Sequence, residues 1–128
     1  MISVIRTKTF IKYARIQLQD AEVAIQDEDI VQAVRLCRDS AVSLIKAIGS
    51  FISGYNPEAL LEDDRILLKA LKDLTNDISN AKSLCDDLVA IKKLDISDES
   101  NSLSRQQVEQ LLSRTGSVFT RIHTSCFH

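Results

Sequence analysis

The residues of this sequence best suited to metal binding are His123, Cys126 and His128, which form the pattern His-x-x-Cys-x-His. Imidazole and thiolate are the ligands that Zn²⁺ prefers, and a structural zinc site normally has four of them. The chain has no other histidine, and its remaining cysteines lie far away in sequence. We therefore expect no cofactor, and a metal could bind here only if a second copy of the chain completed the site.

Four cations, Arg6, Lys8, Lys12 and Arg15, are the only charged residues among residues 1–19. They could bind phosphate groups, since Lys and Arg supply the positive charge and the donors that phosphates require. The alternative is that they offset acidic residues that a helical bundle would bring to the same end, which are Glu58, Glu62, Asp63 and Asp64. The patch lacks exposed aromatic side chains on which bases could stack.

The three cysteines, Cys37, Cys85 and Cys126, are odd in number and far apart, unlike those of a secreted disulfide scaffold. We expect buried free thiols. Cys37 and Cys85 fall on the inner faces of two predicted helices at similar heights, so a disulfide between them is the alternative if their Cα atoms lie within ~7 Å. Cys126 falls at the opposite end.

Other signatures of chemistry are absent from the sequence. It has no glycine-rich phosphate loop, no Ser-His-Asp arrangement and no pair of histidines four residues apart. The net charge of −2 is too even for a domain that binds nucleic acid over its whole surface. Neither a signal peptide nor a run of ~20 apolar residues is present, so we expect a cytoplasmic protein without a membrane partner.

The spacing of apolar residues predicts the elements that must position these side chains. Residues Ile30, Val34, Cys37, Ala41, Leu44, Ile48, Phe51 and Tyr55 follow at steps of four and three, which places them on one face of one helix. Comparable stripes and capping residues predict helices over about 4–26, 30–53, 57–62, 64–93 and 104–127. The serine-rich segment 95–104 is predicted to be an exposed, mobile loop.

Short links between the first helices favour antiparallel neighbours. We therefore expect residues 1–128 to form one all-α domain, an up-down-up-down antiparallel four-helix bundle with a short extra helix at 57–62. The residues Val31, Ile45, Ile52, Leu68 and Ile91 widen the apolar faces beyond one seam. This excess width favours a homodimer.

The predicted hairpin of the first two long helices resembles that of HEPN (higher eukaryotes and prokaryotes nucleotide-binding) domains. The resemblance covers about residues 10–55, where an Ala-rich helix end at 21–25 precedes an acidic turn, and Ala33, Ala41, Lys46 and Ala47 match the family's small residues and Lys-Ala pair. It implies a four-helix, dimeric bundle that binds nucleotide or RNA, often as the partner of a minimal nucleotidyltransferase.

Many members of that family are ribonucleases with an Arg and a nearby His on the last helix. Arg121 and His128, separated by six residues, match this spacing, but Ile122 stands where the family prefers a polar residue. We therefore expect a non-catalytic HEPN-like binding protein. The alternatives are a ribonuclease toxin that uses Arg121 and His128, and a structural adaptor with no nucleotide ligand.

Overall fold

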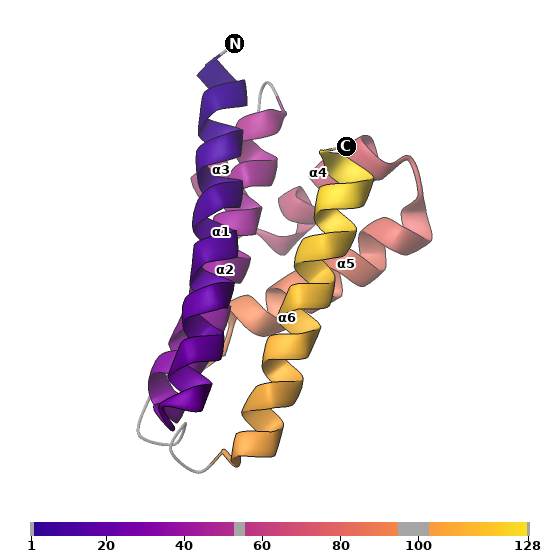
Figure 1. Cartoon of the computed structure of the whole chain (residues 1–128). Helices are drawn as coiled ribbons and strands as arrows, with labels where there is room; N and C mark the ends of the chain where they lie inside the picture. Colours follow the sequence, from indigo (N-terminus) through magenta and orange to yellow (C-terminus); the bar gives the residue numbers. More distant parts are fainter. Residues whose placement is uncertain (1, 53–55, 95–102, 128) are drawn as a thin grey trace.

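The structure of the protein is a computed structural model that describes residues 2–52, 56–94 and 103–127, with the side chains of residues 2 and 3 left out (Figure 1). The described residues form an all-α structure without a strand, as the sequence predicts. The helices are α1 (Ile2–Gln26), α2 (Ile30–Phe51), α3 (Pro57–Glu62), α4 (Asp64–Thr75), α5 (Ile78–Lys92) and α6 (Arg105–Cys126). None of them is long and apolar enough to cross a membrane. The predicted loop at 95–104 lies largely outside the described residues, as do Tyr55 and His128.

Polar side chains cap the helices where the sequence predicts them. The Asp29 carboxylate accepts a hydrogen bond from the Gln32 amide at the start of α2, with a donor–acceptor distance of 3.2 Å. Ser104 and Gln107 form a reciprocal capping box at the start of α6. Asn56 caps α3 ahead of Pro57. Because each cap satisfies an amide that the helix itself leaves unpaired, these residues fix where the helices begin.

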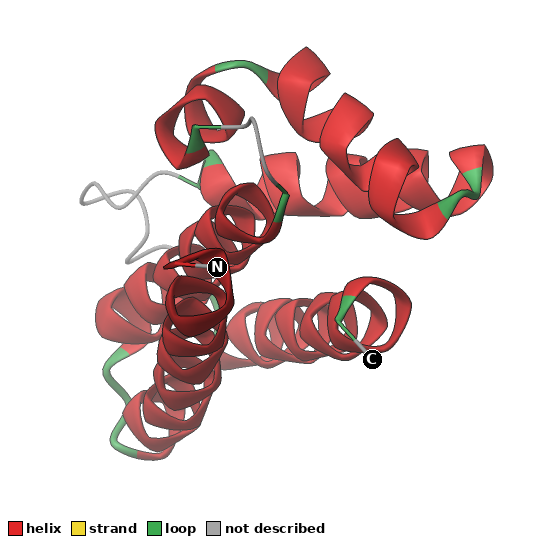
Figure 2. Cartoon of the chain, turned by 90° about the horizontal axis from the view of Figure 1, so that it is seen from above, coloured by secondary structure: helices red, strands yellow, loops and turns green. Residues whose placement is uncertain are grey.

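The α1–α2 hairpin forms the largest helix–helix contact, and α6 packs beside both helices (Figures 1 and 2). Small residues allow the close approach: Ala14 and Ala21 of α1 are fully buried. The Ser40 hydroxyl of α2 donates a hydrogen bond to the Ala14 carbonyl over 2.9 Å, which fixes the register of the two helices. On α2, the predicted core residues Val34, Ala41 and Ile48 are fully buried, so this part of the prediction is confirmed.

The predicted helix over 64–93 is wrong in one respect, since it is broken into α4 and α5 at Asn76. Asn76 adopts a left-handed conformation with φ of 52°, and Asp77 then caps α5 by accepting from the Asn80 amide. The Thr75 hydroxyl accepts from the Asp77 amide. These short polar side chains offer the backbone local hydrogen bonds that compete with those of a helix. As a result α4 and α5 fold back on each other and run across the α1, α2 and α6 layer (Figure 2).

The apolar width that favoured a homodimer is largely used within the chain. Ile45 and Ile91 are fully buried, and Ile52 and Leu68 pack against the main core as partly buried residues. The width of these faces therefore gives no separate support to a homodimer.

Gly49 lies where α2 meets the start of α3. A Cβ atom at this position would stand 2.8 Å from the Pro57 Cα, which is closer than van der Waals contact permits. Gly116 of α6 is a natural comparison, because a Cβ atom there meets nothing within 4 Å. From the sequence alone, Gly49 is expected to weaken α2. The structure explains why a glycine stands there, because a side chain at this position would clash with Pro57.

We predict that Gly49→Ala lowers the free energy of unfolding by about 1–3 kcal/mol, because the added methyl group forces α3 away from α2. Gly116→Ala should raise it by up to about 1 kcal/mol, because only the helix propensity changes. Urea unfolding followed by circular dichroism measures both. Stabilisation by Gly49→Ala would show that the two helices do not meet in this way.

All three cysteines are buried free thiols, as expected, so the alternative of a Cys37–Cys85 disulfide is wrong in this structure. Burial raises the pKa of Cys37 to about 11, partly opposed by a hydrogen bond with Thr115. Burial raises the pKa of Cys126 to about 11 as well. Cys85 instead lies beside α4, with its Sγ 3.7 Å from the Asp64 carbonyl oxygen.

The raised pKa values predict a loss of stability at alkaline pH. An unfolded chain releases its thiol protons near pH 9.0, whereas folded Cys37 and Cys126 hold theirs to about pH 11. Unfolding therefore becomes easier as the pH rises through this window, by on the order of 2 kcal/mol per thiol. Between pH 8 and 11, the free energy of unfolding should fall less steeply for Cys37→Ala than for the parent protein. This difference in slope is expected whether or not the substitution also changes the stability at pH 8. Equal slopes for the two proteins would contradict the raised pKa of Cys37.

Candidate functional site

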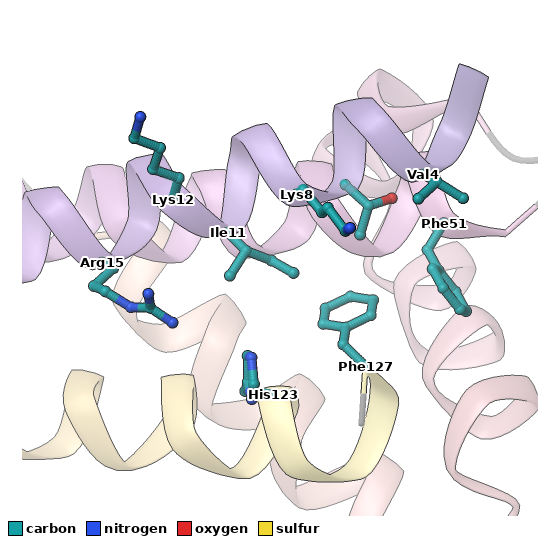
Figure 3. A pocket seen from close by; sticks show the side chains of 9 residues that line it. Val4, Lys8, Ile11, Lys12, Arg15, Phe51, His123 and Phe127 are labelled. Carbon is teal, nitrogen blue, oxygen red and sulfur yellow. The ribbon is translucent and has the colours of Figure 1, made fainter. Parts of the chain in front are cut away.

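Three of the four predicted cations come together in one hollow between α1 and α6 (Figure 3). The hollow measures about 260 Å³ and is open on one side. It is lined by Val4, Thr7, Lys8, Ile11, Lys12 and Arg15 of α1, by Phe51 of α2, and by His123 and Phe127 near the end of α6. Arg6 is not among them, because it lies toward the start of α3 with Lys46 and Glu58.

Helix periodicity explains which cations face the hollow. Lys8, Ile11 and Arg15 follow at steps of three and four, so they share the side of α1 that faces α6. Figure 3 shows the Arg15 guanidinium in the space between the two helices, whereas the Lys12 side chain extends away from α6. The Lys8 side chain, which overlies α1 in this view, is also part of the lining. Lys8 and Arg15 are therefore placed to hold a ligand, and Lys12 contributes charge at the rim.

Aromatic rings form much of the remaining wall, which corrects the expectation that the cations have none nearby. Phe51 and Phe127 meet edge to face, with centroids 5.2 Å apart. His123 stacks on Phe119 at 6.1 Å, and the Arg15 guanidinium carbon lies 5.7 Å from the centroid of the same Phe119 ring. Stacking of this kind orients Arg15 and His123 while leaving their N–H groups able to donate. Sequence reasoning missed these rings because they come from other helices, although Phe119, His123 and Phe127 recur every four residues along α6.

The hollow is electrically unbalanced. No carboxylate lines it. Among the residues that the structure describes, Lys8, Lys12 and Arg15 make no ion pair. An anion could therefore bind without first breaking a salt bridge. The cost of desolvating these exposed groups would also be small, since they remain partly in water.

Two of the four acidic residues expected to offset these cations have other partners. Asp64 pairs with Lys92 and Lys93 over 3.1 and 3.0 Å. The hydrogen bond from Lys93 is the main cause that lowers the pKa of Asp64. Hydrogen bonds from Arg65, its backbone amide first, lower the pKa of Asp63. Local charge complementarity thus holds for Asp63 and Asp64 without the cations of α1, whereas Glu58 lies near Arg6.

The candidate ribonuclease residue Arg121 lies on the side of α6 that faces α5. It pairs with Asp87 over 3.1 Å and donates to Ser83 over 2.9 Å and to Asn80 over 3.4 Å. Arg114 reaches the other oxygen of Asp87 over 2.9 Å. His128, the second residue of the pair, lies outside the described residues. The contacts of Arg121 are those of a link between two helices.

We predict that Arg121→Lys lowers the free energy of unfolding by about 1–2 kcal/mol, because a lysine cannot reach Asp87, Ser83 and Asn80 together. Arg105→Lys is the matched control. Among the described residues Arg105 pairs only with the exposed Glu109 on its own helix, so its replacement should cost less than about 0.5 kcal/mol. Thermal or urea unfolding distinguishes the two, and equal small losses would show that Arg121 does not join α5 to α6.

The structure separates the proposed metal ligands. His123 is exposed at the hollow, whereas Cys126 is buried in the main core, and His128 is not described. Within residues 2–52, 56–94 and 103–127, no group of three His, Cys, Asp or Glu side chains could hold a metal ion.

The arrangement is suited to binding an anion that also carries an apolar or aromatic part. Cations supply the charge on the α1 side, and the rings of Phe51 and Phe127 supply apolar surface beside them. No protein-family model, no curated protein sequence and no solved structure matches this chain.

Proposed function

We propose that this chain is a non-catalytic binding protein that takes a nucleotide, or a terminal phosphate and base of RNA, in the hollow between α1 and α6. The observation that carries the proposal is the position of Lys8 and Arg15. Both face the hollow, and neither has an ion-pair partner in the described chain. Unpaired cations beside aromatic rings are the two components that bind a phosphate and a base at once.

In the proposed complex, Lys8 and Arg15 donate to phosphate oxygens. The guanidinium of Arg15 offers two parallel N–H groups, which suit a phosphate better than a single ammonium does. The base then lies against Phe51 and Phe127. His123, exposed beside Arg15, adds a further donor. A hollow of about 260 Å³ encloses only part of a nucleotide, so we expect modest affinity, on the order of 0.1–1 mM.

The resemblance of residues 10–55 to HEPN domains is a second line of support. On this proposal the protein is a divergent HEPN-like bundle in which α4 and α5 together stand for the third helix. A minimal nucleotidyltransferase is then a candidate protein partner. The ribonuclease alternative is less favoured, because Arg121 is held by Asp87, Ser83 and Asn80 on the α5 side of α6.

We predict that ATP and a short 5′-phosphorylated RNA bind to the parent protein, and that Lys8→Ala or Arg15→Ala weakens binding by about tenfold or more. Lys12→Ala is the matched control, since it removes the same charge from a side chain that extends away from α6, and it should weaken binding by less than about threefold. Isothermal titration calorimetry, or NMR titration for the weakest complexes, measures each constant.

Three results would separate the alternatives. Equal losses for Lys8→Ala and Lys12→Ala would mean that only overall charge matters and that the hollow is not the site. Inorganic triphosphate that binds as tightly as ATP would remove the role of the aromatic rings. Absence of binding at about 5 mM ligand would favour a structural adaptor without a nucleotide ligand.

A further inference from the structure

A second cavity, of about 240 Å³, lies where α1, α2 and the start of α3 surround a common space. Both α1 and α3 pack against α2, but among the described residues they do not pack against each other, and the cavity lies between them. Its lining includes Arg6, Phe10, Lys46, Ser50, Pro57 and Glu58. None of these residues lines the hollow between α1 and α6, so the two cavities are separate.

Helix spacing brings the side chains of α1 and α2 to this cavity. Arg6 and Phe10 lie four residues apart on α1, so they share one side of that helix. Lys46 and Ser50 share one side of α2 for the same reason. The Lys46 amino nitrogen lies 5.9 Å from the centroid of the Phe10 ring, so the two pairs meet across the helix–helix contact.

The start of α3 is positioned by its contact with α2. Since a Cβ atom at Gly49 would stand 2.8 Å from the Pro57 Cα, α3 begins directly against α2. The next residue, Glu58, is held by its backbone amide, which donates to the Asn56 side chain over 3.0 Å. Its carboxylate therefore belongs to the same wall as Pro57 and faces the cations of α1 and α2 across the cavity.

The Ser50 hydroxyl is the feature of this cavity that requires an explanation. Hydroxyl side chains in a helix often bond to the carbonyl four residues back. Four residues of this chain do so, namely Thr9, Thr75, Thr115 and Thr120. Ser50 does not, and its buried Oγ has no hydrogen-bond partner within the described part of the chain. Because such a group costs stability, its place in a cavity wall indicates a ligand that supplies the partner.

The charged side chains of the cavity are also unpaired. Arg6 and Glu58 are exposed, and Lys46 is partly buried. None of the three forms a salt bridge with another described residue. Two cations and one carboxylate line the space. A ligand with two negative groups and one positive group would complement them one by one.

We propose that this cavity binds an acidic α-amino acid. The Arg6 guanidinium donates two parallel hydrogen bonds to one carboxylate of the ligand. The Lys46 ammonium and the Ser50 hydroxyl, neighbours on α2, donate to the other carboxylate. The Glu58 carboxylate accepts from the ammonium group of the ligand, and the Phe10 ring covers its methylene groups.

The size of the cavity agrees with this class of ligand. Its volume of about 240 Å³ lies below the range of about 300–1,000 Å³ that is usual for drug-sized molecules, so a small metabolite suits it better. A ligand this small makes few contacts, and we expect a dissociation constant on the order of 0.1–1 mM.

Isothermal titration calorimetry with L-glutamate and glutarate tests the proposal, because glutarate keeps both carboxylates and lacks the ammonium group. L-Glutamate should bind to the parent chain, and glutarate should bind about tenfold or more weakly, since it leaves Glu58 without a cation. Glu58→Gln should remove this preference by weakening L-glutamate binding about tenfold while glutarate binds no less tightly than before. Arg6→Gln should weaken both ligands by about tenfold or more. Lys82→Gln, which removes an exposed charge of α5, should change neither constant, and circular dichroism verifies that each variant is folded.

Ser50→Ala separates a role in binding from a role in folding. It should weaken both ligands by about threefold to tenfold without lowering the midpoint of thermal unfolding, because the hydroxyl that it removes has no partner in the protein alone. Ser40→Ala is the matched control on the same helix. It should lower the midpoint, because the Ser40 hydroxyl donates to the Ala14 carbonyl. A Ser50→Ala variant that loses stability and binds as the parent does would contradict the proposal.

NMR titration with L-glutamate locates the site. Amide shifts centred on Lys46, Ser50 and Glu58 would support the proposal, whereas shifts centred on Lys8 and Arg15 would place the amino acid in the other hollow and overturn it. Absence of binding at about 20 mM, or equal binding of L-glutamate and glutarate to the parent chain, would overturn it as well. These outcomes leave the proposed nucleotide site untouched, because that site depends on residues that do not line this cavity.

Discussion

The close contact of α1 with α2 is the constraint on which the rest of the structure depends. Buried alanines at positions 14 and 21 let the two backbones approach, and the Ser40 hydroxyl ties α2 to the Ala14 carbonyl. This fixes both the distance and the rotation of α1 on α2. Once the rotation is fixed, the side of α1 that carries Lys8 and Arg15 must face α6, and the side that carries Ile5 and Val23 must face outward. A larger residue at position 14 would move both surfaces together.

The charges of the protein are arranged in two separate groups. Asp64 at the start of α4 is neutralised by Lys92 and Lys93 at the end of α5, and Asp87 is neutralised by Arg114 and Arg121 of α6. These pairs hold the α4–α5 hairpin in place. The cations of α1 have no such partners, although the net charge of the chain is −2. An almost neutral protein can thus present a basic hollow, because acids such as Asp64 and Asp87 are paired elsewhere.

Much of the fold could be predicted from the sequence, because it depends on local signals. Asp29, Asn56 and Ser104 begin their helices by hydrogen bonds to residues two or three positions away, and the buried stripe of α2 follows from its spacing alone. The break at Asn76 was missed because the apolar period continues across it, from Leu71 and Leu74 to Ile78. In the structure Ile78 is one of the most exposed apolar residues. The short polar side chains of the Thr-Asn-Asp sequence, which favour a turn, outweigh the helical spacing of the apolar residues. The hollow could be predicted only in part. Its cations are adjacent in sequence, but Phe51, His123 and Phe127 join them through packing between three helices.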